Sequence, residues 1–170
     1  MRILHISDFH LSNDDANIAK SQKIVDGLIE AVKTANEKYP IDLVIFSGDA
    51  INKGGEGFAS LKDGFLSFQT ILIEPLMETL HLPLTNFIWC IGNHDIDRKL
   101  DSKYAEAGIA GKLTSLQAID DFCSDKNNLR DIRRIEPFKS YEKSFYQSVL
   151  GSNYRFGDFE SCYKYQIGNK

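Results

Sequence analysis

The pattern of apolar and polar positions divides the chain into short strands separated by longer helices. Four short apolar runs predict β-strands, and they cover residues 2–7, 41–47, 87–91 and 162–167. The second and third runs are almost continuously apolar, which is typical of strands covered on both faces of a sheet. These two runs are therefore expected to lie at the centre of the fold.

Helical periodicity fills the intervals between the first three predicted strands. From about residue 19 to residue 38, apolar side chains recur at three- and four-residue steps, and Pro40 ends the pattern. The same spacing returns over residues 58–76, with Pro75 inside the run. We expect a kink at this proline, or a break with a second helix starting there. The alternation of strand and helix predicts a layered α/β fold.

The pattern changes after the third predicted strand. Between about residues 98 and 151 there is no strand-like run, but apolar side chains keep helical spacing. The two helical stripes are Leu113, Leu116, Ile119 and Phe122, followed by Phe138, Tyr141, Phe145 and Val149. We expect a helical insertion that lies over or beside the sheet, within a single domain that includes residues 1–170.

Composition narrows the class of protein. Hydrophobic residues make up 42% and charged residues 26% of the chain, the balance of a folded globular protein rather than a disordered one. The net charge of −4 gives no overall positive field for nucleic acid. The N-terminal apolar run is too short for a signal peptide, and no apolar stretch approaches the ~18 residues of a membrane helix.

The cysteines agree with an intracellular protein. Three cysteines without CxxC spacing argue against a disulfide framework and against a structural zinc site. They predict reduced, mostly buried thiols. We therefore expect a soluble cytoplasmic protein that does not interact with membranes.

Three short polar clusters carry the candidate chemistry, and each follows a predicted strand. The clusters are Asp8-Phe9-His10, Gly48-Asp49 and Gly92-Asn93-His94-Asp95. Because the carboxyl ends of neighbouring strands in an α/β sheet are where ligands gather, we expect the three clusters to converge. The two glycines let the backbone turn tightly and approach a bound ion.

The side chains of these clusters suit divalent metals. Asp8 and His10 are separated by one residue, so in an extended segment both point to the same side and can chelate one ion. Asp49 offers a carboxylate able to bridge two ions, and Asn93 offers a neutral amide oxygen. Carboxylate combined with imidazole favours manganese, iron or zinc over magnesium or calcium. One aspartate after a strand is usually a turn former or helix cap, but three such clusters together indicate a metal site.

In their order and spacing, the clusters resemble the first three signature blocks of the calcineurin-like metallophosphoesterase superfamily. The resemblance covers roughly residues 1–100 and implies a layered sheet flanked by helices, with the helical insertion after the third strand. It also implies two divalent ions, with manganese favoured and iron or zinc as alternatives. Asp8 and His10 would bind the first ion, Asp49 would bridge the two, and Asn93 would bind the second.

The resemblance further implies hydrolysis of a phosphodiester or phosphomonoester. A dinuclear metal centre would activate water for in-line attack on phosphorus. His94 is expected to protonate the leaving oxygen, with Asp95 fixing the tautomer of its imidazole. Asn93, His94 and Arg98 are the candidate substrate-binding residues. For Arg98, an ordinary salt bridge is an equal alternative to a phosphate clamp.

The substrate class stays open at this point. A nuclease is one hypothesis, because double-strand-break repair nucleases share these blocks. A phosphodiesterase for cyclic or other small nucleotides and a phosphoprotein phosphatase are the others. Arg130, Arg133 and Arg134 form a candidate patch for a phosphate backbone. A solvated helix face is the more common explanation for such a run of charges.

The chain departs from the family pattern in its histidines. The family completes its site with further histidines, including a Gly-His-x-His block, whereas the last of the four histidines here is His94. We expect this chain to be the N-terminal part of a longer protein whose remainder completes the fold and the site. Alone it would bind metal weakly and hydrolyse little. The alternative is a degenerate phosphoesterase fold that acts as a regulatory or binding module without catalysis.

Overall fold

A three-stranded parallel sheet forms the centre of the computed structural model, which describes residues 1–100, 103–124, 133–147, 154–157 and 161–164. The strands are β1 (Ile3–Ile6), β2 (Leu43–Phe46) and β3 (Phe87–Trp89), in the order β1-β2-β3. In the register of the sheet, Ile6 pairs with Phe46 and Phe46 with Trp89. The three strands predicted for this part of the chain are therefore present, each shorter than predicted.

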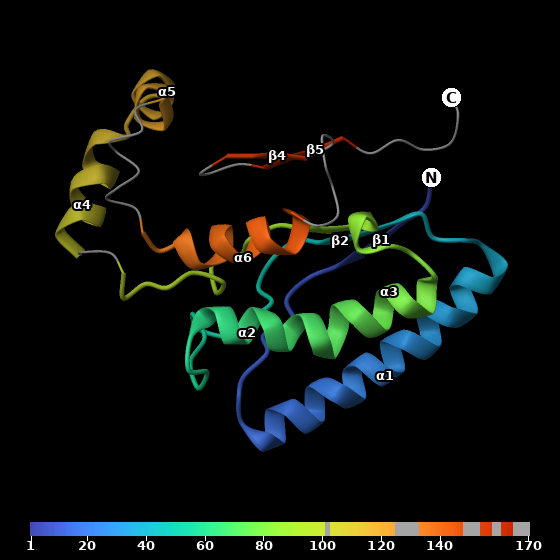
Figure 1. Ribbon diagram of the computed structural model, residues 1–170. Coiled ribbons are helices and arrows are strands. Elements are labelled where there is room, and N and C mark those ends of the chain that lie inside the picture. The colour runs from blue at the N-terminus through green and yellow to red at the C-terminus, as the bar shows by residue number, and fades with distance from the viewer. Residues whose placement is uncertain (101–102, 125–132, 148–153, 158–160, 165–170) are drawn as a thin grey trace.

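The first helix, α1 (Asp15–Lys38), connects β1 to β2. It begins four residues before the predicted start because Asp14 caps it, accepting a 3.0 Å hydrogen bond from the backbone N–H of Asn17. Its buried face includes Val25 and Val32, and it packs beside α3 (Glu74–Leu80) (Figure 1).

The second connection is one long helical stretch with a π-helical turn inside it (Figure 1). Helix α2 (Leu61–Phe68) is capped by Ser60 and continues through the π-helical segment η1 (Gln69–Ile73) into α3. Pro75 lies at the start of α3, directly after the π-helical segment. The second helix therefore starts near Pro75 as predicted, but the helical backbone is not broken there, since it continues from α2 into α3 through the π-helical segment.

The hydrophobic core lies between one face of the sheet and these helices. Phe46 and Trp89 from the sheet contact Phe68 from α2, with ring centroids 4.8 and 4.9 Å apart. The opposite face is less covered than the apolar strand sequences predict. Ile45 and Ile88 are half-buried there, and Ile3 is 41% exposed.

Helices α4 (Lys103–Lys112), α5 (Leu116–Ser124) and α6 (Glu136–Gln147) follow β3, which confirms the helical character predicted for this part of the chain. Helix α6 packs against α2 and buries Phe138 and Tyr141 in the core. The apolar stripe of α5 is not packed in this way, since Leu116 is 82% exposed and Figure 1 shows α4 and α5 projecting from the sheet. Val149 lies outside the described residues.

A small antiparallel pair follows α6 along the chain. It consists of β4 (Tyr154–Phe156) and β5 (Ser161–Tyr163). The strand predicted at 162–167 is seen as β5, and residues 165–167 lie outside the described residues. Strand β4 was not predicted. Cys90 and Cys162 are exposed, so for these two thiols the prediction of burial is wrong.

Within the described ranges, no helix combines the length and the apolar character that crossing a membrane requires.

Candidate metal centre

The loops that follow β1, β2 and β3 meet at one edge of the sheet. Backbone hydrogen bonds join the first two loops, from Asp8 N–H to the Gly48 carbonyl at 3.0 Å and from His10 N–H to the Asp49 carbonyl at 2.9 Å. The third loop is joined to the second by the backbone N–H of His94, which donates to Asp49 Oδ1 at 2.9 Å. The three polar clusters of the sequence therefore lie side by side.

Three side chains of this edge point at a common space. Among the described histidines, cysteines and acidic residues, one potential ligand atom each from His10, Asp49 and His94 lie within 4.8 Å of one another. Asp8 reaches this group from a more exposed position, with its Oδ1 3.8 Å from His10 Nε2. The two carboxylates and the imidazole of His10 are donors that fit a borderline divalent cation, so the residues present suit a metal.

Two glycines allow the loops after β2 and β3 to come this close. A Cβ atom on Gly92 would lie 2.1 Å from Asp49 Oδ1 and 2.3 Å from the Asp49 backbone nitrogen. Gly48 has a φ of 108°, and a Cβ there would lie 2.8 Å from the Cα of Gly92. Glycine is therefore required at both positions, which fixes the Asp49 carboxylate against the loop that carries His94.

The candidate ligands from the first two loops have unusual backbone conformations. Asp8, His10 and Asp49 have φ values of 57°, 53° and 60°, in the left-handed region that non-glycine residues seldom occupy. Such conformations persist where the surrounding structure holds them, and they cluster at functional sites. The three residues with candidate metal-binding side chains in these loops are therefore also residues with left-handed backbone conformations.

The carboxylate of Asp95 organises the backbone of the site. Asp95 is completely buried, and its oxygens accept hydrogen bonds from the backbone N–H groups of Asp49, Ile51 and Gly92 at 2.8, 2.9 and 3.0 Å. Burial raises the pKa of this carboxyl, and the three backbone hydrogen bonds oppose that shift. The prediction that Asp95 fixes the His94 tautomer is wrong, because both oxygens are directed at backbone groups.

The orientation of His94 is set instead by the loop after β2. The backbone N–H of Lys53 donates to His94 Nδ1 at 3.1 Å, and the backbone N–H of Gly54 donates to the His94 carbonyl at 2.8 Å. Since Nδ1 accepts, the proton of a neutral imidazole is assigned to Nε2. An Nε2–H group donates hydrogen bonds and offers no lone pair, which favours a donor role over a ligand role for His94.

Lys53 and Gly54 were not among the residues singled out from the sequence. The available signal was the glycine-rich run at residues 54–57, which indicates a tight turn soon after Asp49. Lys53 itself has a φ of 44°, and a Cβ on Gly54 would lie 2.7 Å from the Ile96 carbonyl oxygen. The turn thus needs glycine at position 54 to approach the third loop.

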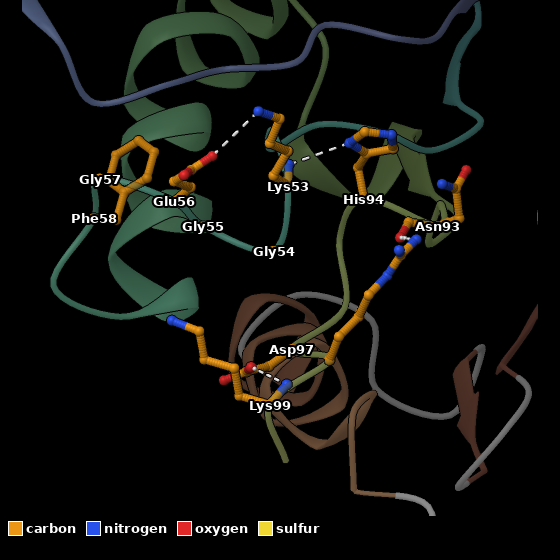
Figure 2. A pocket seen from close by; sticks show the side chains of 11 residues that line it. Lys53, Gly54, Gly55, Glu56, Gly57, Phe58, Asn93, His94, Asp97 and Lys99 are labelled. Atoms are coloured by element: carbon orange, nitrogen blue, oxygen red, sulfur yellow. Dashed lines mark hydrogen bonds and ion pairs between the residues drawn. The ribbon is translucent and has the colours of Figure 1, made fainter. Parts of the chain in front are cut away.

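The remaining candidates, Asn93 and Arg98, line a cavity of about 620 Å³ together with His94. Figure 2 shows Asn93 and His94 side by side in its wall. Asn93 is exposed, and its backbone carbonyl oxygen accepts a long, 3.4 Å hydrogen bond from Arg98 Nη2. Arg98 therefore lies against the third loop, and within the described residues it forms no ion pair with a carboxylate.

The candidate arginine patch is only partly described. Arg133 precedes α6 by three residues and forms an exposed ion pair with Glu136 at 3.4 Å. Arg130 lies outside the described residues.

The protein is thus an α/β protein with carboxylates and imidazoles gathered at the ends of its parallel strands, which makes this edge a candidate metal site. The family model described as calcineurin-like phosphoesterase matches residues 1–156. The chain therefore belongs to the calcineurin-like phosphoesterase family, and the match extends past β3 to the end of β4. Comparison with curated proteins gave no match.

Proposed function

We propose that this protein is a phosphoester hydrolase that uses two divalent ions, with manganese the best suited. The observation that carries the proposal is the convergence of His10, Asp49 and His94 in a chain of the calcineurin-like phosphoesterase family. When bound, such ions polarise phosphoryl oxygens and acidify water, which supplies a nucleophile near neutral pH. Nucleotides and nucleic acids are the proposed substrate classes.

The proposed ligands divide between the two ions. Asp8 and His10 would hold the first ion, and their 3.8 Å separation supports a shared ion. Asp49 would bridge the two ions, although its Oδ1 already accepts the N–H of His94. The amide oxygen of Asn93, at the exposed rim of the third loop, would bind the second ion.

His94 is the proposed hydrogen-bond and proton donor to the leaving oxygen. Its Nδ1 accepts from Lys53, so Nε2 carries the donor proton. Asp95 is a positioning residue, because it holds the backbones of Asp49 and Gly92 and not the substrate. Asn93 and Arg98, which both line the cavity, are proposed to contact phosphoryl oxygens of the substrate.

The proposal is tested by hydrolysis of bis(4-nitrophenyl) phosphate by the natural full-length protein, with manganese and with a chelator. His94→Ala is expected to lower turnover by about 100- to 10,000-fold while manganese stays bound. Asp49→Ala is expected to lose manganese in elemental analysis. Asp26→Ala, on the exposed face of α1, is the matched control and should retain both metal and activity.

Two results would contradict parts of the proposal. Manganese retained by Asp49→Ala would exclude the bridging role. A protein that binds manganese but hydrolyses neither this ester, nor single-stranded DNA, cyclic nucleotides or a phosphopeptide, would instead be a binding module. Cleavage of only one member of that panel would identify the substrate class.

A further inference from the structure

We propose that the cavity beside His94 binds a second phosphate group of the substrate. This inference rests on the proposed function, in which the scissile phosphate lies at the converging side chains of His10, Asp49 and His94. It adds that the preferred substrate carries another phosphate nearby. That phosphate would come either from the next nucleotide of a short chain or from a second position on one nucleotide.

The cavity adjoins the candidate metal centre at His94. Its wall includes His94 and Asn93, so a ligand reaching into it passes directly beside the proposed proton donor (Figure 2). One side is the turn from Lys53 to Phe58, and the other is the segment from Asp97 to Lys99. A volume of about 620 Å³ lies within the range of small-molecule sites.

The charges that line the cavity leave a positive excess. The cations are Lys53, Arg98 and Lys99, and the acids are Glu56 and Asp97. Within the part of the chain that the structure describes, neither Arg98 nor Lys99 forms an ion pair with a carboxylate. The Asp97 carboxylate accepts the backbone N–H of Lys99 at 3.0 Å, a contact that leaves the Lys99 ammonium unused.

The remaining ion pair is too weak to remove the site's attraction for anions. Lys53 Nζ lies 3.5 Å from Glu56 Oε2, and the two side chains are 67% and 68% exposed. Pairs this exposed contribute little, because water and salt screen them. The Lys53 ammonium therefore stays available to a phosphate that enters the cavity.

The position of the Arg98 side chain and the size of the cavity also favour a phosphate. Arg98 is held against the Asn93 carbonyl by one of its N–H groups, and a guanidinium has further N–H groups to offer an anion. The opposite wall includes the backbone of Gly54, Gly55 and Gly57, and the cavity volume of about 620 Å³ leaves room for a group as large as phosphate.

The test compares adenosine 3′,5′-bisphosphate with adenosine 5′-monophosphate, by calorimetric titration of the natural full-length protein loaded with manganese. The bisphosphate is expected to bind about tenfold more tightly at low salt, and the ratio should shrink as salt is raised. Lys99→Gln should reduce this ratio about three- to tenfold. Lys23→Gln, an exposed lysine of α1 that does not line the cavity, should leave the ratio unchanged.

The unmodified protein is also titrated with thymidine dinucleotides that carry or lack a 5′-phosphate. The proposal would be overturned if the extra phosphate raised affinity neither in the adenosine pair nor in the dinucleotide pair. An unchanged ratio in both Lys99→Gln and Arg98→Gln would also overturn it. A gain limited to the dinucleotides would identify the next nucleotide as the source of the second phosphate. Because the readout is binding, it is separate from hydrolysis of bis(4-nitrophenyl) phosphate, so either proposal can fail alone.

Discussion

Asp8, His10 and Asp49 occupy left-handed backbone conformations at the ends of two parallel strands. For residues other than glycine, each such conformation costs on the order of 1–3 kcal/mol. Hydrogen bonds hold these backbone conformations in place. They are the N–H···O bonds between the first two loops and the bond from the Asp49 N–H to the buried Asp95 carboxylate. The candidate ligands are thus preorganised by backbone contacts rather than by packing of their own side chains.

Gly92→Ala tests how closely the loops must approach. The new Cβ would lie 2.1 Å from Asp49 Oδ1 and 2.3 Å from the Asp49 backbone nitrogen, so rotating a side chain cannot relieve the contact. We expect a loss of about 1–3 kcal/mol in the free energy of unfolding, together with loss of manganese binding. Chemical denaturation and calorimetric metal titration measure the two effects.

Gly27→Ala is the control for that experiment. Gly27 lies in α1, and a Cβ added there would meet no atom of the described residues within 4 Å, leaving aside its own helix backbone. Alanine at this position should therefore raise stability by about 0.5–1 kcal/mol. Normal metal binding by Gly92→Ala would show that the Asp49 carboxylate does not need its present position.

At this scale the sequence predicts residue identities better than residue roles. The convergence of the loops that carry Asp8, Asp49 and His94 is predictable, because side chains with metal-binding chemistry follow three successive strands. The role of Asp95 was not, because adjacency to His94 suggested contact, whereas consecutive residues of a tight turn direct their side chains differently. Lys53 acts on His94 through a backbone N–H, a group present in every residue except proline.

One tyrosine of α6 covers the outer edge of β3. The Tyr146 hydroxyl donates to the Phe87 carbonyl at 2.7 Å and accepts from the Trp89 N–H at 3.1 Å, so it satisfies two backbone groups on the side of β3 away from β2. Tyr146 itself is buried, and Tyr154 and Tyr163 pack on its ring. The helix therefore protects the sheet edge that leads into the third loop of the site.

Tyr146→Phe is expected to destabilise the protein by about 1–3 kcal/mol, because it removes the partner of a buried N–H and of a buried carbonyl. Tyr39→Phe, at a tyrosine that is 51% exposed, should change stability by no more than about 0.5 kcal/mol. Denaturant titration of both variants gives the comparison. Equal stability of the two variants would show that the edge of β3 does not depend on this hydroxyl.

Elements with a long repeated pattern were predictable, and short elements were not. The helix ending at Lys38 and the start of a helix near Pro75 follow from apolar spacing and proline chemistry. Strand β4 spans only three residues, and its pairing with β5 depends on tertiary contacts with Tyr146. Helix α5 was predictable as a helix, but its packing was not. An amphipathic pattern predicts a helix without showing what covers its apolar face.

The candidate site exists only when the whole sheet has formed, because its residues come from three loops separated by two helical connections. Metal binding is therefore expected to be linked to folding. Manganese at 100 times its dissociation constant should stabilise the folded protein by about 2.7 kcal/mol. Thermal unfolding with and without manganese measures the shift.

Two comparisons make this measurement specific. Calcium at the same concentration should give a smaller shift, since it prefers oxygen ligands to imidazole. Asp49→Ala should remove the manganese shift. A shift that persists in that variant would place the bound manganese somewhere other than the candidate centre.

For the molecule as a whole, the fold class and the family were predictable from the sequence, because the clusters and the alternating elements are both local patterns. The cavity was not, since its two walls, the turn from Lys53 and the segment ending at Lys99, are far apart in the chain and meet only through folding.

The buried carboxylate of Asp95 has a consequence for how such sequences are compared and designed. Three N–H groups require acceptors at this point, so an asparagine would present an amide group where a second acceptor is needed. An aspartate at this position is therefore needed to hold the loops together, whether or not the protein hydrolyses a phosphoester. A descendant that had lost His10 and its activity would still need Asp95 to fold. Asp95 of the Gly-Asn-His-Asp block is therefore a marker of architecture, whereas the proposed metal ligands together with His94 would be the marker of catalysis.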